Sequence, residues 1–386
     1  MKIVEVRTTV VTVPFTRPEV WARGARPCVT NVILELETDD GLTGLGECGG
    51  GQKMAEAIAG FSRYLVGSDP FDLIERQRQR LHWSPAPDAF CAMEMALLDL
   101  QGKATGRPVY QLLGGAVHRQ VPFMYYLLRD KIDVMGREAA AAVAAGFDTV
   151  LIKVGVEIEE DLAAIQAVRD AIGPHAKLRI DPNESWTVGT AARIFRRIEA
   201  LDIELVEDPV PHVDLAGWRK LRASTSVPIA AQENAHTLAD ILTVIREGAA
   251  DIILVDPYRN GGLTGMKSAA VLAEAAGLPV YMHSGGSLGV ATAAAVHTLA
   301  TIPNNVLASQ TYAQFMGGDV VKEDVNRFEK GCLSPSEQPG LGVTLDAEKL
   351  AHFHEVYVRG EVVDGSFRRD DLSQEVAEEN LYYPKY

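Results

Sequence analysis

The sequence predicts a protein of the α/β class, in which a (β/α) barrel follows a smaller α+β domain. Short apolar runs that end in a polar or charged residue recur along the middle of the chain, at intervals between 23 residues (256 − 233) and 28 residues (181 − 153). A stretch of helical periodicity follows each run, so the repeated unit is a strand and a helix. Residues 1–50 instead alternate apolar and polar side chains, which is typical of antiparallel strands.

Composition limits the classes of function. The 386 residues, 47% of them hydrophobic, suffice for two globular domains. No apolar run reaches the roughly 18 residues of a membrane span, and the first residues lack a signal-peptide pattern, which predicts a cytoplasmic protein. The net charge of −15 argues against nucleic acid or a membrane surface as partner and means that a bound cation must attract an anionic substrate. The four cysteines contain no CxxC and are predicted to be reduced.

The first domain is expected to span residues 1–118. Alternating patterns predict strands at 1–13, 29–38 and 42–48, with the DDG turn between the last two. Residues 14–28 are predicted to form a long functional loop that carries Trp21, Arg23 and Arg26. Helices are expected within 53–113, where apolar residues recur on one helix face.

The barrel is expected to span residues 119–320. Its first strand is predicted within 121–130, its second ends at Lys153, and its last lies at 305–310. Beyond it, residues 339–358 predict a turn, a short strand and a helix. We expect segment 321–386 to return to the first domain, because the chain ends of two-domain proteins are often close. Its charged and aromatic tail is predicted either to be disordered or to dock on a partner subunit.

Three carboxylates follow consecutive barrel strands, at Asp181, Glu207 and Glu233. Neighbouring parallel strands lie roughly 5 Å apart, so these side chains can converge on one ion. Without a cation they would repel and raise each other's pKa. All-oxygen ligation favours Mg²⁺, with Mn²⁺ as a possible substitute.

Two further groups predict proton-transfer chemistry on either side of these carboxylates. Lys153 ends the preceding strand, and burial beside a cation should lower its pKa and make it a general base. His283 follows a strand on the other side, where Asp256 would fix its tautomer. A metal with bases on two sides suits removal of a proton α to a carboxylate, followed by racemisation or by loss of a β-hydroxyl.

The chain resembles the enolase superfamily over nearly its whole length. The resemblance rests on LTGLGE, AMEMALLDLQGKATGRPVYQLLGG, IKVG, DPN, VEDP, QEN, the glycine pair after Asp256, MHS and PGLG. It implies a modified TIM (β/α) barrel under an N-terminal capping domain completed by the C-terminal segment. It also implies that Asp181, Glu207 and Glu233 bind Mg²⁺ and that loops near Trp21 and 49–52 close over the substrate. A homo-oligomer is common in this superfamily.

Within the superfamily, the Asp256/His283 pair resembles the mandelate racemase branch. The strings DPNESW, VEDP, VDP and HS resemble glucarate dehydratase and other acid-sugar dehydratases. Two positions depart from the family pattern. Leu151 replaces a lysine that helps to hold the substrate carboxylate, and Gln310 stands near the usual place of an acid that hydrogen-bonds the enediolate.

These features predict a Mg²⁺-dependent lyase that dehydrates an acid sugar or related α-hydroxy acid. A racemase, epimerase or cycloisomerase acting at the same site is the alternative, and a barrel that binds metal and ligand without turnover is an alternative of another class. The partner is a small-molecule carboxylate. Its predicted contacts are Trp21, Arg23, Asn183 of the DPN motif and Gln310.

Overall fold

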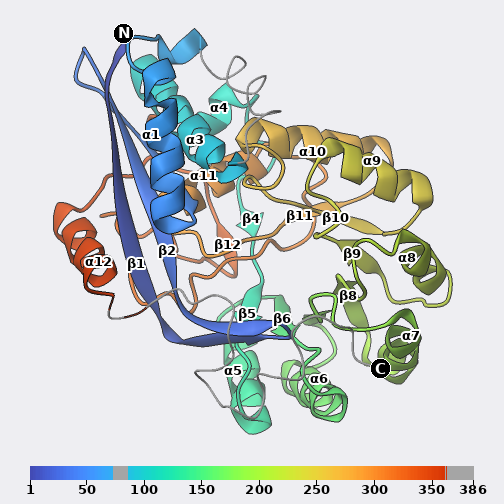
Figure 1. Ribbon diagram of the computed structural model, residues 1–386. Coiled ribbons are helices and arrows are strands. Elements are labelled where there is room, and N and C mark those ends of the chain that lie inside the picture. The colour runs from blue at the N-terminus through green and yellow to red at the C-terminus, as the bar shows by residue number, and fades with distance from the viewer. Residues whose placement is uncertain (73–85, 361, 363–386) are drawn as a thin grey trace.

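The computed structural model describes residues 1–72, 86–360 and 362. It has the predicted architecture, a strand-and-helix barrel beside a capping unit of three antiparallel strands and their helices (Figure 1). The tail at 364–386, on which the prediction of disorder or docking falls, lies outside these residues. No helix in the described part of the chain is both long enough and apolar enough to cross a membrane.

The barrel contains a parallel sheet of seven strands in the order β11-β10-β9-β8-β7-β6-β5 within the described residues. Alternate side chains of each strand enter two different cores. Val150 and Ile152 pack outward against the helices, whereas Leu151 faces the interior with Leu205 and Tyr281. This alternation leaves the last inward position of a strand at the barrel mouth. The strands are β5 (Tyr125–Leu127), β6 (Thr149–Lys153), β7 (Lys177–Asp181), β8 (Ile203–Glu207), β9 (Ile229–Ala231), β10 (Ile252–Val255) and β11 (Val280–Met282).

Helices α5 to α10 flank the barrel strands (Figure 1). Helix α7 shows why they dock there: its buried residues Ala191, Ile194, Phe195 and Ile198 share one face. Helices α7, α8 and α10 each follow a barrel strand, as the repeated strand-and-helix unit predicts. The barrel helices are α5 (Ile132–Ala144), α6 (Ile158–Ile172), α7 (Val188–Ile198), α8 (Leu215–Arg222), α9 (Leu238–Glu247), α10 (Leu263–Ala275) and α11 (Gly289–Leu299), with the 3₁₀ turn η2 at Glu199–Leu201.

The predicted last strand at 305–310 is wrong as a regular strand. Only two isolated parallel bridges form there, from Asn305 to Val280 and from Ser309 to Phe123. Backbone N–H groups of this segment still reach both sides, because Ser309 donates to Pro122 O and Gln310 donates to Met282 O. An irregular segment therefore completes the ring between β11 and the start of the barrel.

The predicted loop at 14–28 is also wrong. Strand β1 (Ile3–Trp21) pairs with β2 (Gly24–Thr38) up to the pair Trp21–Gly24, so this segment is the far end of a long hairpin. Pro14 and Pro18 fit within this strand because β1 lies at the edge of the sheet, where proline is tolerated. The hairpin end bends toward β5 and β6 (Figure 1).

The rest of the cap follows the predicted order. Strand β3 (Thr43–Gly49) completes the antiparallel sheet, and α3 packs against it. As expected, the C-terminal segment returns to the cap: α12 contacts β1, and His354 Nδ1 bonds Val10 O at 2.7 Å. The remaining elements are α1 (Gly51–Leu65), η1 (Pro70–Asp72), α3 (Pro87–Thr105), α4 (Val109–Leu112), α12 (Ala347–Arg359) and the paired short strands β4 (Val121–Pro122) and β12 (Cys332–Leu333).

Two buried cap carboxylates bind the N-termini of barrel helices. Glu47 on β3 accepts the N–H groups of Leu288 (2.6 Å) and Ala291 (2.9 Å) at the start of α11. Glu94 on α3 accepts from the hydroxyl and N–H of Thr264 at the start of α10. Negative groups satisfy the free donors at a helix start and interact favourably with its dipole. These two contacts therefore fix the cap over the barrel.

We expect replacement of Glu47 by alanine to destabilise the protein by about 3 kcal/mol, because two backbone donors and the Asn31 amide would lose their buried acceptor. Glu47→Gln keeps an acceptor oxygen and should lose less than half of that. Urea unfolding followed by circular dichroism measures both values. Equal midpoints for the wild type and Glu47→Ala would contradict this role.

Candidate active site at the barrel mouth

Lys153 and Asp181 meet at the ends of adjacent strands. They are register partners between β6 and β7, and Lys153 Nζ donates to Asp181 Oδ2. Asp181 is fully buried and its Oδ1 accepts the N–H of Asn183 at 2.7 Å. The lysine ammonium also lies 5.7 Å from the centre of the Tyr126 ring. The predicted base is therefore held by one of the predicted metal ligands.

The predicted lowering of the Lys153 pKa depends on a divalent cation beside the neighbouring carboxylates and stays a prediction. Burial lowers the pKa of Lys153, but the carboxylates of Asp181 and Glu207 outweigh burial and raise it above its ordinary value. The lysine thus compensates part of the negative charge of these carboxylates.

Glu207 is buried, and only one of its two carboxylate oxygens has a hydrogen-bond partner among the described residues. Its Oε2 accepts the hydroxyl of Tyr281 at 2.6 Å, whereas its Oε1 is buried without a hydrogen-bond partner among the described residues. Burial and the neighbouring Asp181 raise the pKa of Glu207 to about 7. A buried carboxylate with one unpaired oxygen needs either a proton or a cation.

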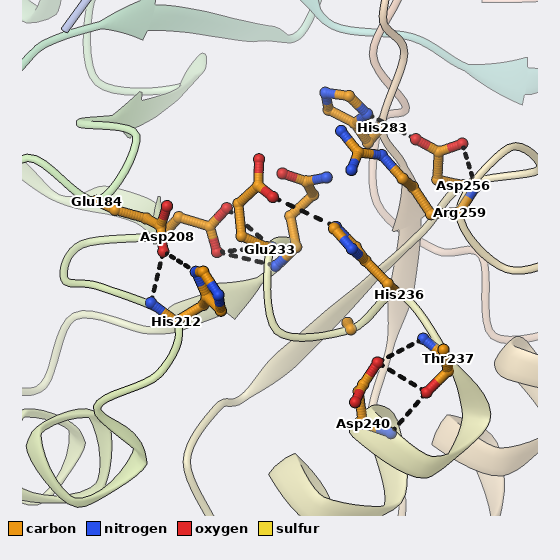
Figure 2. Close-up of polar contacts among 12 residues, drawn as sticks. Glu184, Asp208, His212, Glu233, His236, Thr237, Asp240, Asp256, Arg259 and His283 are labelled. Carbon is orange, nitrogen blue, oxygen red and sulfur yellow. Dashed lines mark hydrogen bonds and ion pairs between the residues drawn. The ribbon is translucent and has the colours of Figure 1, made fainter. Parts of the chain in front are cut away.

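Glu233 lies on the loop that follows β9 (Figure 2). Its N–H donates to Asp208 Oδ2 at 3.2 Å, and its own carboxylate lies 3.3 Å from His236 Nε2. Burial raises the pKa of Glu233, but His236 and Arg259 outweigh it and bring the pKa to about 2. Glu233 is thus a carboxylate at neutral pH.

The predicted ligands lie on one rim but are not gathered around one point. Within residues 1–72 and 86–360, no three His, Cys, Asp or Glu side chains are close enough to hold a metal ion. Asp181 is drawn to Lys153 and Glu233 to His236. Asp208 adds to the negative charge, since burial and then Glu207, Asp181 and Glu233 raise its pKa strongly. This donor set matches the chemistry of a hard cation, because the carboxylates are buried, repel each other and leave one oxygen unpaired.

The predicted Asp256/His283 pair is formed. Asp256 follows β10, His283 follows β11, and His283 Nδ1 lies 2.8 Å from Asp256 Oδ2 (Figure 2). Asp256 Oδ1 also accepts the N–H of Tyr258 at 2.7 Å, which fixes the carboxylate. With Nδ1 occupied by this contact, Nε2 is the nitrogen left to exchange a proton.

Gln310 and Asn183 each present an unpaired buried atom. Gln310 Oε1 accepts the N–H of Ser284 at 3.1 Å, and its Nε2 has no partner in the described part of the chain. Asn183 has a positive φ of 46° beside Asp181, and its Oδ1 is likewise unpaired. Both atoms are free to bind a polar ligand, and their role as substrate contacts stays a prediction. Arg179 is the register partner of Leu151 on the neighbouring strand and lies in the barrel interior. Its Nη1 donates to Ala308 O at 2.6 Å.

Trp21 and Arg23 lie at the tip of the β1–β2 hairpin. Arg23 is paired with the buried Glu184 on the loop after β7. The same carboxylate accepts from the backbone N–H of His212 and lies 2.6 Å from its Nδ1 (Figure 2). The guanidinium predicted to hold a substrate carboxylate is therefore occupied by a carboxylate of the chain itself.

Glu19 is a buried residue of this site that sequence reasoning missed. It accepts hydrogen bonds from the hydroxyls of Tyr126 (2.5 Å) and Tyr312 (2.8 Å) and from Arg26 Nε (2.7 Å). Burial raises the pKa of Glu19, but Arg26 and Lys153 lower it by more, so the pKa of Glu19 lies below its ordinary value. Glu19 thus binds the hairpin to the barrel close to the predicted base.

Tyr281 and Asp208 were also missed, although the sequence contained a signal for each. Tyr281 is two residues before His283 and so faces the same side of its strand. Asp208 directly follows Glu207 in VEDP. Glu19 has no comparable signal, because its partners come from distant parts of the chain.

A capped (β/α) barrel with a lysine and an Asp/His pair on either side of a carboxylate rim defines the class of enolase-like barrels. The comparison with known families agrees. The N-terminal domain model of mandelate racemase / muconate lactonizing enzyme matches residues 3–114, and the enolase C-terminal domain-like model matches residues 134–349. The chain belongs to the mandelate racemase / muconate lactonizing enzyme family of the enolase superfamily.

Several relatives extend over nearly the whole chain. A probable glucarate dehydratase of Streptomyces coelicolor is 31% identical over 90% of this chain and 89% of its own length. A hydrophobic dipeptide epimerase of Enterococcus faecalis is 31% identical over 89% of this chain and its full length. Among solved structures, an enolase from Thermobispora bispora complexed with magnesium and formate superimposes with a TM-score of 0.89 at 32% identity, covering 99% of this chain and 100% of that one. These relatives are lyases and isomerases, as predicted.

We expect Glu19→Ala to loosen the hairpin, because Arg26 and two tyrosine hydroxyls would lose a shared acceptor. Trypsin should then cleave after Arg23 about tenfold faster, which corresponds to about 1.4 kcal/mol of local opening. Mass spectrometry of timed digests gives the rate. Glu37→Ala, which removes a half-exposed partner of Arg7 on the same sheet, is the control. Equal cleavage rates in the two variants would rule out this docking role.

Proposed function

We propose that this protein removes the α-proton of a carboxylate substrate and dehydrates an acid sugar or related α-hydroxy acid. One observation supports this most strongly: Lys153 ends β6, His283 follows β11, and the carboxylates of β7, β8 and the loop after β9 lie between them. Two groups able to transfer protons thus flank a rim that suits a cation. The protein is further proposed to work in the cytoplasm as a homo-oligomer, with residues 1–118, 119–320 and 321–386 as its units.

Asp181, Glu207 and Glu233 would hold Mg²⁺. Their carboxylate oxygens are the ligands that this ion prefers, and the unpaired Glu207 Oε1 is available to it. For Asp181 and Glu233 to join, they must exchange their contacts with Lys153 and His236. When bound, the ion would supply positive charge to the substrate carboxylate, whose negative charge grows as the α-proton leaves.

The side chains of the mouth then have separate roles. Lys153 or His283 takes the α-proton, and His283 gives a proton from Nε2 to the departing β-hydroxyl, which leaves as water. Asp256 holds the imidazole by its Nδ1. The free Nε2–H of Gln310 donates to the developing enediolate in place of an acid. The enol that forms then becomes a 2-keto acid.

Racemisation or epimerisation is the second candidate, since the same two groups could remove and return a proton on opposite faces. The dipeptide epimerase relative favours it, whereas the dehydratase-like strings and the glucarate dehydratase relative favour dehydration. A barrel without turnover is the candidate of another class, and Leu151 and Gln310 favour it.

With D-glucarate and Mg²⁺, we expect the wild type to form a 2-keto acid, detected as its semicarbazone. Lys153→Ala and His283→Ala should each lower the rate at least about a hundredfold, because general acid–base catalysis contributes that much. Deuterium from D₂O should still enter Cα in the variant that retains the α-base. Exchange that persists in both variants would remove these residues as bases, and product of unchanged mass and carbonyl content would favour the epimerase.

Tyr281→Phe should weaken Mg²⁺ binding about ten- to hundredfold, because Tyr281 holds one oxygen of Glu207 and orients the other. Calorimetric titration of the full-length protein with MgCl₂ measures this without turnover. Tyr110→Phe removes a similar Tyr–Glu hydrogen bond away from the mouth, to Glu337, and serves as the control. Equal affinities in both variants would mean that Glu207 needs no such partner.

A further inference from the structure

An anionic group at the far end of a substrate would need a cation at the mouth, yet most arginines there already have carboxylate partners. Arg23 is paired with Glu184. Arg26 bonds Glu19 at 2.7 Å. Two further arginines also form ion pairs with carboxylates: Arg17 with Asp130 and Glu138, and Arg129 with Glu160 and Asp161.

Arg259 differs from these arginines. It lies in the turn after β10, is exposed, and its guanidinium has no hydrogen bond or ion pair with another described residue. Figure 2 shows this guanidinium beside His283, on the side that faces Glu233. Arg259 attracts the carboxylates of both Glu233 and Asp256. Burial raises the pKa of each carboxylate, a neighbouring histidine lowers it, and Arg259 lowers it further by a smaller amount.

A network of hydrogen bonds holds the backbone of the turn that carries Arg259. The backbone N–H of Arg259 donates to Asp256 Oδ1 at 3.3 Å, and the backbone N–H of Asp256 donates to Asn260 Oδ1 at 2.8 Å. Asn260 in turn donates to the carbonyls of Ala235 and His236, both at 2.9 Å. The same carboxylate therefore positions His283 and the backbone of Arg259, so the side chain of Arg259 starts from a defined place relative to the histidine.

We propose that Arg259 binds a second carboxylate at the far end of the substrate, so that this enzyme takes dicarboxylic sugar acids rather than acids with one carboxylate. This inference rests on the proposed function, in which the first carboxylate and the α-carbon lie between Lys153 and His283. The carbon that loses its hydroxyl must then be near His283, and the rest of the chain continues past it toward Arg259. A guanidinium binds a carboxylate in a bidentate manner, which gives selectivity as well as affinity.

Lys53 is the competing cation. It lies on α1, and both Lys53 and Arg259 lower the pKa of Asp88, which burial otherwise raises. Lys53 therefore also lies near the seam between cap and barrel. Its flexible point charge would attract an anion with less selectivity for a planar carboxylate.

The test compares D-glucarate with D-gluconate, which differ in the far carboxylate, by calorimetric titration of the full-length protein with Mg²⁺ present. We expect Arg259→Met to weaken glucarate binding about tenfold and to change gluconate binding less than about twofold. Arg259→Lys should recover only part of the loss. Lys53→Met is the matched control and should leave the ratio of the two affinities unchanged.

Equal weakening of both acids by Arg259→Met would overturn the inference, as would a loss of selectivity in Lys53→Met or a wild type that does not prefer glucarate. The assay for 2-keto acid is run on the same samples. Selective glucarate binding without keto acid would keep Arg259 as the carboxylate site and reject dehydration. Keto acid formed equally well from both acids would support dehydration and reject the role of Arg259. Because Arg259 is exposed, its variants should keep the melting temperature of the wild type.

Discussion

The structure depends on how it accommodates a set of buried negative charges at one end of a barrel. Asp181, Glu207 and Asp208 are at most 1% exposed, and they come from neighbouring strands. Such charges are tolerated only when each finds a donor or an opposite charge. Here Lys153, the Tyr281 hydroxyl and backbone N–H groups provide part of that compensation. The oxygen of Glu207 that remains unpaired is what makes a cation the natural complement of the site.

The cap contributes to the same balance and does more than cover the mouth. Glu47 and Glu94 fix it to the starts of α11 and α10, where helix N–H groups would otherwise be unpaired. The closeness of this packing is shown at Gly262, where a Cβ would lie 2.0 Å from Glu94 Oε2. Only glycine therefore fits where α10 begins beneath the cap helix.

Sequence reasoning located the strand ends and the inward side chains, because both follow from the backbone repeat. Lys153, Asp181, Glu207, Asp256 and His283 all end or directly follow a strand. It failed where the outcome depends on contacts between distant segments. The segment 14–28 was predicted to be a loop, whereas the edge position of β1 makes a strand acceptable there despite Pro14 and Pro18. The pairing of Arg23 with Glu184 and the shared role of Glu19 depend on how the cap docks, which no local pattern contains.

The hairpin and the predicted base are coupled by this docking. Glu19 belongs to the cap, yet its hydroxyl partners Tyr126 and Tyr312 belong to the barrel, and its charge acts on Lys153. Lys153 also lies over the Tyr126 ring. Any change in the hairpin that moves Glu19 therefore changes the electrostatic environment of the lysine as well as the shape of the mouth. The position of Glu19 is therefore constrained by the barrel residues that it contacts.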